Sequence, residues 1–214
     1  MTWIKLCGTT NLEDALISAE AGADALGFVF WERSPRNIDV QTVRKIVREL
    51  PGKIEKVGVF VQEPVERVRQ IIEETGLTAA QLHYVNRQDE KWSVGNFKKY
   101  FVLQAEEPAE TVFLQQKPAT WVNALFLDSG SRAKPGGTGK RFDWKKYKPL
   151  MGNMHSNGFK LVVAGGLTKD NVGEAIRILE PWGVDVVSGV EASPGKKDPA
   201  RVRAFVQAVR QASK

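Results

Sequence analysis

The chain alternates between short apolar segments and longer amphipathic ones, and a glycine or a polar turn separates most of them. The first apolar segment, Ile4 to Gly8, carries the only cysteine in 214 residues. Behind it, Thr10 and Glu13 have the T-x-x-E spacing of a capping box, and apolar residues recur with a helical period until Gly22. We therefore predict a strand that ends at Cys7, followed by a short loop and a helix.

The same unit of strand and helix recurs along the rest of the chain. The predicted strands end at Cys7, Phe30, Phe60, His83, Ala105, Asp128, Ala164 and Ser188. The later predicted helices cover residues 40–50, 65–75, 88–97 (a weak pattern), 106–117, 143–151, 169–179 and 198–212. Alternating strands and helices require parallel pairing, and eight such units close into a barrel around a side-chain core. We predict an α/β protein with a single (β/α)8 TIM barrel over residues 1–214. An open doubly wound sheet is the alternative, but no G-x-G-x-x-G follows the first strand.

Composition is compatible with a folded domain in a reducing compartment. Apolar residues make up 42% of the chain, which is enough to bury a core. No run of about 18 uncharged apolar residues predicts a membrane span, and the segment before Ile4 is too short for a signal peptide. A single cysteine cannot form an internal disulfide, so we expect a cytoplasmic protein.

The net charge of +6, from 31 Lys and Arg against 25 Asp and Glu, allows three interpretations. The charge can simply be solvated at the surface, it can attract a small anionic substrate, or it can bind nucleic acid. The basic residues are spread along the chain, with no block longer than Lys145-Lys146 or Lys196-Lys197. This spacing disfavours nucleic acid.

Two glycine turns suggest a phosphate site. Barrel enzymes place active sites at the carboxyl ends of their strands, and phosphate sites commonly follow strands seven and eight. Here those positions hold Gly165-Gly166-Leu167-Thr168 and Ser188-Gly189-Val190-Glu191. Glycine lets backbone N–H groups approach a phosphate closely. A tight turn alone would also use glycine, but two such turns after neighbouring strands favour phosphate binding.

Three side chains could carry the chemistry. Asp128 ends an apolar strand, where it could cap the next segment or, with a raised pKa, act as a general acid. Cys7 could be an inert core residue or a partly ionised thiol that accepts a proton. Arg36 could be a surface charge or could hold a substrate carboxylate with two hydrogen bonds.

A metal site and a nucleotide loop are not expected. His83, His155 and one cysteine do not form a ligand cluster, so we predict no catalytic metal. The stretch from Gly136 to Lys140 superficially resembles a P-loop, but Lys134 and Arg141 occupy positions where that motif needs Gly and Ser or Thr.

Nine motifs in one order resemble the phosphoribosylanthranilate isomerase family of tryptophan biosynthesis. They begin at residues 5, 22, 34, 57, 81, 127, 136, 164 and 184 and read KLCG, GADALGFVF, SPRNI, VGVF, QLH, LD, GGTGKRFDW, AGGL and VDVVSGVE. The resemblance covers nearly the whole chain. It implies an Amadori rearrangement of N-(5-phosphoribosyl)anthranilate without a cofactor.

The resemblance also implies a role for each candidate residue. Asp128 would be the general acid that opens the ribose ring, and Cys7 the general base that removes the C2 proton. Arg36 would hold the anthranilate carboxylate, and the backbone at Gly166, Ser188 and Gly189 would hold the phosphate. For this chemistry the pKa of Asp128 should be raised and the pKa of Cys7 lowered.

Two residues depart from the family pattern, and two other functions remain open. Tyr84 stands where the family usually has Gly, and Val187 stands where it commonly has Ser.

A related barrel isomerase of histidine biosynthesis would use two aspartates, so Cys7 argues against it. A basic nucleic-acid-binding module is the second alternative. We expect a small phosphorylated substrate, no nucleic acid or membrane partner, a monomer or homodimer, and possible closure of the loop at residues 129–140.

Overall fold

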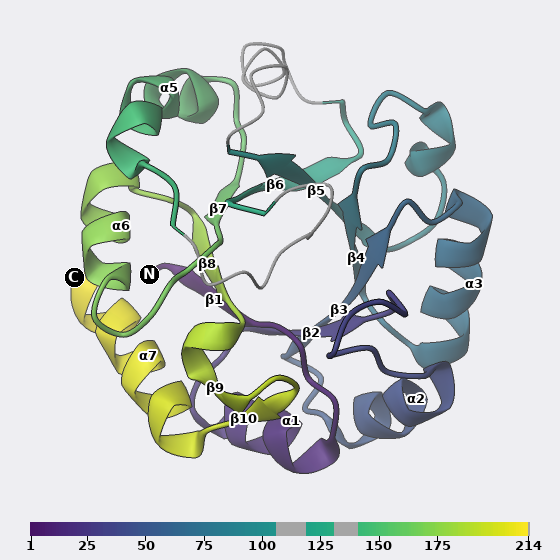
Figure 1. The fold of residues 1–214 in the computed structure, drawn as a ribbon. Coiled ribbons are helices and arrows are strands. Elements are labelled where there is room, and N and C mark those ends of the chain that lie inside the picture. Colours follow the sequence, from purple (N-terminus) through teal and green to yellow (C-terminus); the bar gives the residue numbers. More distant parts are fainter. Residues whose placement is uncertain (106–118, 131–140, 214) are drawn as a thin grey trace.

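A computed structural model describes residues 1–105, 119–130 and 141–213. Eight parallel strands form a closed barrel in chain order, with β1 next to β8 (Figure 1). The strands are β1 (Trp3–Leu6), β2 (Ala25–Val29), β3 (Glu55–Val61), β4 (Ala79–His83), β5 (Lys98–Gln104), β6 (Val122–Asp128), β7 (Leu161–Val163) and β8 (Gly183–Val186). The predicted TIM barrel is confirmed.

Helices surround this barrel (Figure 1). They are α1 (Leu12–Glu20), α2 (Val40–Glu49), α3 (Val65–Thr75), α5 (Trp144–Ser156), α6 (Val172–Leu179) and α7 (Pro199–Ala212). Two short 3-10 helices, η1 (Glu90–Ser93) and η2 (Ser188–Val190), and a small hairpin of β9 (Glu191–Ser193) and β10 (Lys196–Lys197) complete the described elements. The helix predicted at 106–117 and most of the loop predicted at 129–140 lie outside the described residues.

The strands separate two cores because successive side chains point to opposite faces of a strand. The outward side chains, such as Leu6, Phe28 and Leu125, are fully buried against the helices. The inward side chains fill the barrel, and those near its amino end are apolar or aromatic. At that end Trp3 stacks on Trp182 with ring centroids 4.9 Å apart.

The aromatic group at the amino end closes the inside of the barrel, and we call Trp3, Tyr100, Phe126 and Trp182 the barrel floor. The rings of Trp3 and Phe126 meet edge to face at 6.3 Å, and those of Tyr100 and Phe126 lie 5.6 Å apart. Such pairs add packing energy beyond their buried area. The floor leaves the carboxyl end of the barrel, which we call the mouth, as the open end for ligands.

Helix starts differ from the prediction in two places. The N-cap of α1 is Asn11, whose side chain accepts a hydrogen bond from the Asp14 N–H at 2.9 Å, so the predicted Thr10 capping box is wrong. Thr10 instead donates to the Gly195 carbonyl oxygen at 2.5 Å. Helix α6 begins at Val172, later than predicted, because Thr168 to Asn171 form a turn with its own hydrogen bonds.

Other boundaries also shift. The weak pattern at 88–97 yields only the short helix η1, whereas α5 runs beyond its predicted end to Ser156. Strand β8 ends at Val186, so Ser188 belongs to η2 and the chain then turns into the β9–β10 hairpin. Within the described part of the chain, no helix is long and apolar enough to cross a membrane.

Candidate active site

Cys7 follows β1 at the mouth of the barrel, with 4% of its surface exposed. A side chain at Gly27, on the neighbouring strand β2, would place its Cβ 2.6 Å from the Cys7 sulfur. Gly27 is therefore required for the thiol to point inward. Val29 and Val59 pack beside Cys7 and remove most of its solvation.

An ion pair lies deeper in the barrel than Cys7. Lys5 Nζ donates to Asp185 Oδ1 at 3.0 Å, and both side chains are almost completely buried. The two residues are register partners across the junction of β1 and β8. The Lys5 ammonium also stands 5.4 Å from the centre of the Phe126 ring, so the pair rests on the barrel floor.

Asp128 is the last residue of β6, and 5% of its surface is exposed. Burial raises the pKa of this carboxyl to about 6, although a hydrogen bond from the Gly130 N–H opposes the shift. The direction agrees with the expectation from the sequence. A carboxyl group with such a pKa is partly protonated near neutral pH and can donate a proton.

The pKa of Cys7 does not follow the expectation. Burial raises it above its usual range, and the positive charge of Lys5 offsets this only in part. The predicted lowering of the Cys7 pKa is therefore wrong. The sequence showed the thiol at a strand end but did not show how thoroughly Val29 and Val59 would desolvate it.

The Lys5–Asp185 pair is electrostatically coupled to both candidate groups. β1, which leads to Cys7, and β6, which ends at Asp128, are separated by β7 and β8 on their shorter path around the barrel. The charges of Lys5 and Asp185 affect the pKa of Cys7 and also the pKa of Asp128. A change at the ion pair is therefore felt by both groups.

Arg36 lies at the rim of the mouth in the loop after β2. Its Nε and Nη2 atoms donate to the two carboxylate oxygens of Glu191 at 2.8 and 2.7 Å. A Cβ at Gly8 would come within 2.6 Å of the Arg36 side chain, so Gly8 makes room for it. Burial raises the pKa of Glu191, but Arg36 and Lys197 outweigh it and hold the pKa below its usual range.

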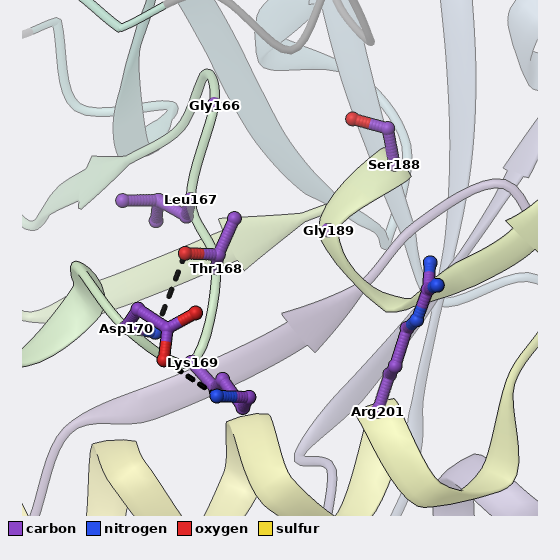
Figure 2. A pocket seen from close by; sticks show the side chains of 8 residues that line it. All are labelled: Gly166, Leu167, Thr168, Lys169, Asp170, Ser188, Gly189 and Arg201. Atoms are coloured by element: carbon purple, nitrogen blue, oxygen red, sulfur yellow. Dashed lines mark hydrogen bonds and ion pairs between the residues drawn. The ribbon is translucent and has the colours of Figure 1, made fainter.

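The two glycine loops after β7 and β8, where the sequence predicts a phosphate site, line a cavity of about 360 Å³ (Figure 2). Gly166 and Ser188 lie on opposite sides of it, and Arg201 reaches toward it from α7. Gly189 approaches the other loop so closely that a Cβ there would lie 2.0 Å from the Leu167 carbonyl oxygen. The lining is Gly166, Leu167, Thr168, Lys169, Asp170, Ser188, Gly189 and Arg201.

A narrower pocket connects these loops with the acid. It is lined by residues that include Asp128, Gly165, Asp185 and Ser188. A phosphate held by the loops and a proton donated by Asp128 can thus serve one extended molecule. The structure brings Cys7, Asp128, Arg36 and the two loops to the same end of the barrel.

The two departures from the family pattern have local structural effects. Tyr84 has a φ of 56°, a left-handed conformation that glycine adopts more easily. It follows β4 and precedes η1. Val187 packs its side chain with the apolar group around Cys7, so an aliphatic side chain replaces a hydroxyl there.

The sequence analysis missed four charged residues of the mouth: Lys5, Asp185, Glu191 and Lys197. Each is buried and charged. Lys5 and Asp185 stand inside otherwise apolar strands, and this pattern could have marked each of them as a buried charge. Of the residues that the structure describes, no three potential metal ligands group together.

Comparison with known proteins adds an independent line of evidence. Residues 4–208 match the family described as N-(5'phosphoribosyl)anthranilate (PRA) isomerase. An N-(5'-phosphoribosyl)anthranilate isomerase of Pelobacter propionicus is 42% identical over 207 residues, which cover 97% of this chain and 95% of the relative.

Solved structures agree. A monomeric form of the dimeric phosphoribosylanthranilate isomerase of Thermotoga maritima matches with a TM-score of 0.84 and 34% identity, covering 99% of this chain and 100% of that one. A phosphoribosylanthranilate isomerase in complex with reduced 1-(o-carboxyphenylamino)-1-deoxyribulose 5-phosphate matches with the same TM-score of 0.84, the same 34% identity and the same coverage.

Proposed function

Because the chain belongs to the N-(5'-phosphoribosyl)anthranilate isomerase family of tryptophan biosynthesis, we propose that Asp128 and Cys7 are the general acid and general base of its reaction. The reaction is an Amadori rearrangement, in which an aminoaldose becomes an aminoketose. It needs one group that protonates the ribose ring oxygen and one that removes a proton from carbon C2. Asp128 and Cys7 face the same end of the barrel from different strands.

Asp128 suits the role of the acid. A buried carboxyl with a pKa of about 6 still carries a proton in part of the molecules at neutral pH. Transfer of that proton to the ring oxygen breaks the C1–O bond and leaves a Schiff base between C1 and the anthranilate nitrogen. The resulting Asp128 carboxylate accepts a hydrogen bond from the Gly130 N–H.

Cys7 suits the role of the base. Once the Schiff base has formed, the proton on C2 becomes acidic, and a thiolate at Cys7 can remove it. The electrons then move into an enolamine, which tautomerises to the ketone. The space above Gly27 fixes the direction of the sulfur, and proton transfer requires such a fixed geometry.

The two anionic ends of the substrate determine the remaining contacts. The backbone at Gly166, Ser188 and Gly189 holds the phosphate, and Arg201 adds positive charge to that cavity, where Lys169 is paired with Asp170. Arg36 holds the anthranilate carboxylate with hydrogen bonds that its Glu191 partner leaves available. The reacting carbons then lie between these two anchors.

The observation that carries the proposal is the burial of Asp128 beside the pocket that joins it to the phosphate loops. The test is to mix purified protein with N-(5'-phosphoribosyl)anthranilate and to follow the loss of its fluorescence. We expect a strong acceleration over buffer. Absence of acceleration by a folded protein would refute the activity.

The roles are tested separately with Cys7→Ala. We expect kcat to fall by at least about 10²-fold because a general base of this kind contributes that much. Thr2→Ala is the matched control, since Thr2 is buried before the same strand at the amino end of the barrel. A wild-type rate for Cys7→Ala would leave the family activity intact and remove Cys7 from the mechanism.

A further inference from the structure

We propose that Lys5 is a positioning residue for Cys7: its ammonium group, anchored by Asp185, lies beside the thiol and stabilises its thiolate form. The proposal deepens the proposed function, because it matters for catalysis only if Cys7 is the base. It assigns a task to a fully buried lysine that the acid–base mechanism does not otherwise use.

The geometry around Gly27 places the two side chains together. Lys5 and Cys7 are two residues apart, so both side chains point into the barrel from the same chain segment. The position that a Cβ on Gly27 would occupy lies 2.6 Å from the Cys7 sulfur and 3.1 Å from Lys5 Cε. The thiol and the end of the lysine therefore converge on one point.

The surroundings keep Lys5 charged. Burial alone would lower its pKa, but the Asp185 carboxylate and the Cys7 thiolate outweigh burial and raise the pKa of Lys5 above its usual range. Asp185 accepts the Lys5 hydrogen bond at 3.0 Å, and the Phe126 ring lies 5.4 Å away on the floor side. The ammonium is thus held between an anion, an aromatic face and the thiol.

Other charged groups reach Cys7 from neighbouring elements. From β10, the Lys197 ammonium donates a hydrogen bond to the Cys7 carbonyl oxygen, and its Nζ atom lies 3.6 Å from Glu191 Oε1. From the loop after β2, Arg36 interacts with the Cys7 charge but is engaged by Glu191. From β8, the negative charge of Asp185 disfavours the thiolate.

Across the mouth, Asp128 on β6 and His83 on β4 both respond to the charge of Lys5. Burial lowers the pKa of His83 to about 3, so this imidazole is neutral and supplies no competing positive charge. The hydrogen bond of Lys197 to a carbonyl oxygen and its contact with Glu191 divide its charge among several partners. Lys5 is therefore the cation with the strongest effect on the sulfur.

The experiment uses the single cysteine as its own reporter. The ultraviolet absorbance of the thiolate is recorded as a function of pH in the full-length protein. The same curve of Cys7→Ser is subtracted as a blank, because tyrosine also absorbs in this range. We compare wild type with Lys5→Met and with the double variant Lys5→Met/Asp185→Asn, which leaves no unpaired buried charge. Lys56→Met is the matched control, because that lysine also lies on a strand but bonds to the Pro51 carbonyl oxygen at the amino end.

We expect Lys5→Met to move the thiolate titration upward by about 1–3 pH units, and Lys56→Met to leave it in place. The double variant should move it upward by less, because it also removes the repulsion from Asp185. Circular dichroism identifies a variant that fails to fold, and the double variant then supplies the measurement. An unchanged titration in folded Lys5→Met overturns the proposal, as does a larger shift in Lys197→Met than in Lys5→Met. If Lys5→Met does not fold, the double variant is compared with Asp185→Asn, and an unchanged titration between those two overturns the proposal. A wild-type rate in Cys7→Ala would instead refute the proposed base without touching this result.

Discussion

The two ends of the barrel interior are built from the same strands but have opposite character. At the amino end, the floor of Trp3, Tyr100, Phe126 and Trp182 is held by ring contacts between 4.9 and 6.3 Å. At the mouth, the buried polar side chains of His83 and Asp128 stand at strand ends, and Cys7 lies beside the apolar Val29 and Val59. An inward side chain near the amino end of a strand thus contributes to packing. One or two inward positions later, the same strand can carry a side chain that takes part in chemistry.

β6 shows the contrast within one strand. Phe126 belongs to the floor and Asp128 to the mouth, although both point inward and both are almost fully buried. Burial favours the phenyl ring, whereas it penalises the ionised carboxylate and shifts its pKa. The barrel therefore gains stability at one end and keeps reactive groups at a cost in stability at the other.

The largest expected effect comes from breaking the floor. Phe126→Ala should destabilise the protein by about 3–5 kcal/mol, because it removes a fully buried ring and leaves a cavity beneath Lys5. Urea unfolding followed by circular dichroism measures the change. Val94→Ala, at a position 57% exposed, is the control and should change stability by less than about 0.5 kcal/mol.

A mutation at the mouth should lower activity without lowering stability. Asp128→Asn should lower kcat by at least about 10²-fold, because the amide cannot donate the proton of a carboxylic acid. Stability at pH 8 should not fall, since the variant removes a carboxylate that burial disfavours. Steady-state kinetics and unfolding on the same sample test both statements, with the exposed Asp143→Asn as control.

The sign of the Asp128 effect on stability can be checked with pH. Its pKa is raised in the folded state, so the folded protein binds the proton more tightly and stability falls as pH rises through about 4 to 6. Asp128→Asn should lose this part of the pH dependence. If stability changed with pH equally in the wild type and in Asp128→Asn, a raised pKa for the buried Asp128 carboxyl would be contradicted.

A smaller effect is expected at the rim. Glu191→Gln should cost about 1.5–3 kcal/mol at pH 7, because an amide can accept only one of the two Arg36 hydrogen bonds of 2.7 and 2.8 Å and leaves the guanidinium without its counter-ion. The pKa of Glu191 is lowered in the folded state, so this stabilisation is present above its unfolded pKa and is lost as pH falls. The unfolding curves of the wild type and of the variant should therefore differ at pH 7 and converge only when the pH falls well below the usual Glu pKa of about 4.3. A difference that persists in such acid would contradict the ion pair.

The smallest effect concerns the pH profile of kcat/KM in the wild type. Activity should rise about tenfold per pH unit up to about 6, stay level, and decline only above the usual cysteine range. The pKa of Asp128 then sets the midpoint of the acidic limb, and the pKa of Cys7 sets the midpoint of the alkaline limb. This order follows because Cys7, the base, has the higher pKa of the two groups. A profile that is flat through pH 6 would contradict the pKa of Asp128.

Much of the fold could be predicted from the sequence, because strand and helix periods repeat with glycine and polar breaks between them. The short elements could not. The β9–β10 hairpin has strands of three and two residues, too short for a period to be visible. The start of α1 was misplaced because Thr10 and Asn11 are both good caps, and a contact with Gly195, far along the chain, decides between them.

For the site, the sequence placed Cys7, Asp128 and the glycine loops at the mouth because strand ends in a parallel barrel all meet there. It could not reveal how charges would pair inside. The partner of Lys5 is 180 residues away, and the partner of Arg36 is 155 residues away in the unpredicted hairpin. The pKa of Cys7 is raised because Val29 and Val59, on two other strands, help to bury the thiol, and the short motif around Cys7 does not contain them.

The Lys5–Asp185 pair also joins the first strand of the barrel to the last. During synthesis, Lys5 is made 180 residues before its carboxylate partner. An incomplete barrel would hold a lysine without its counter-ion beside an unprotected thiol. Pairing of β1 with β8 thus closes the barrel and also completes the electrostatic environment of Cys7.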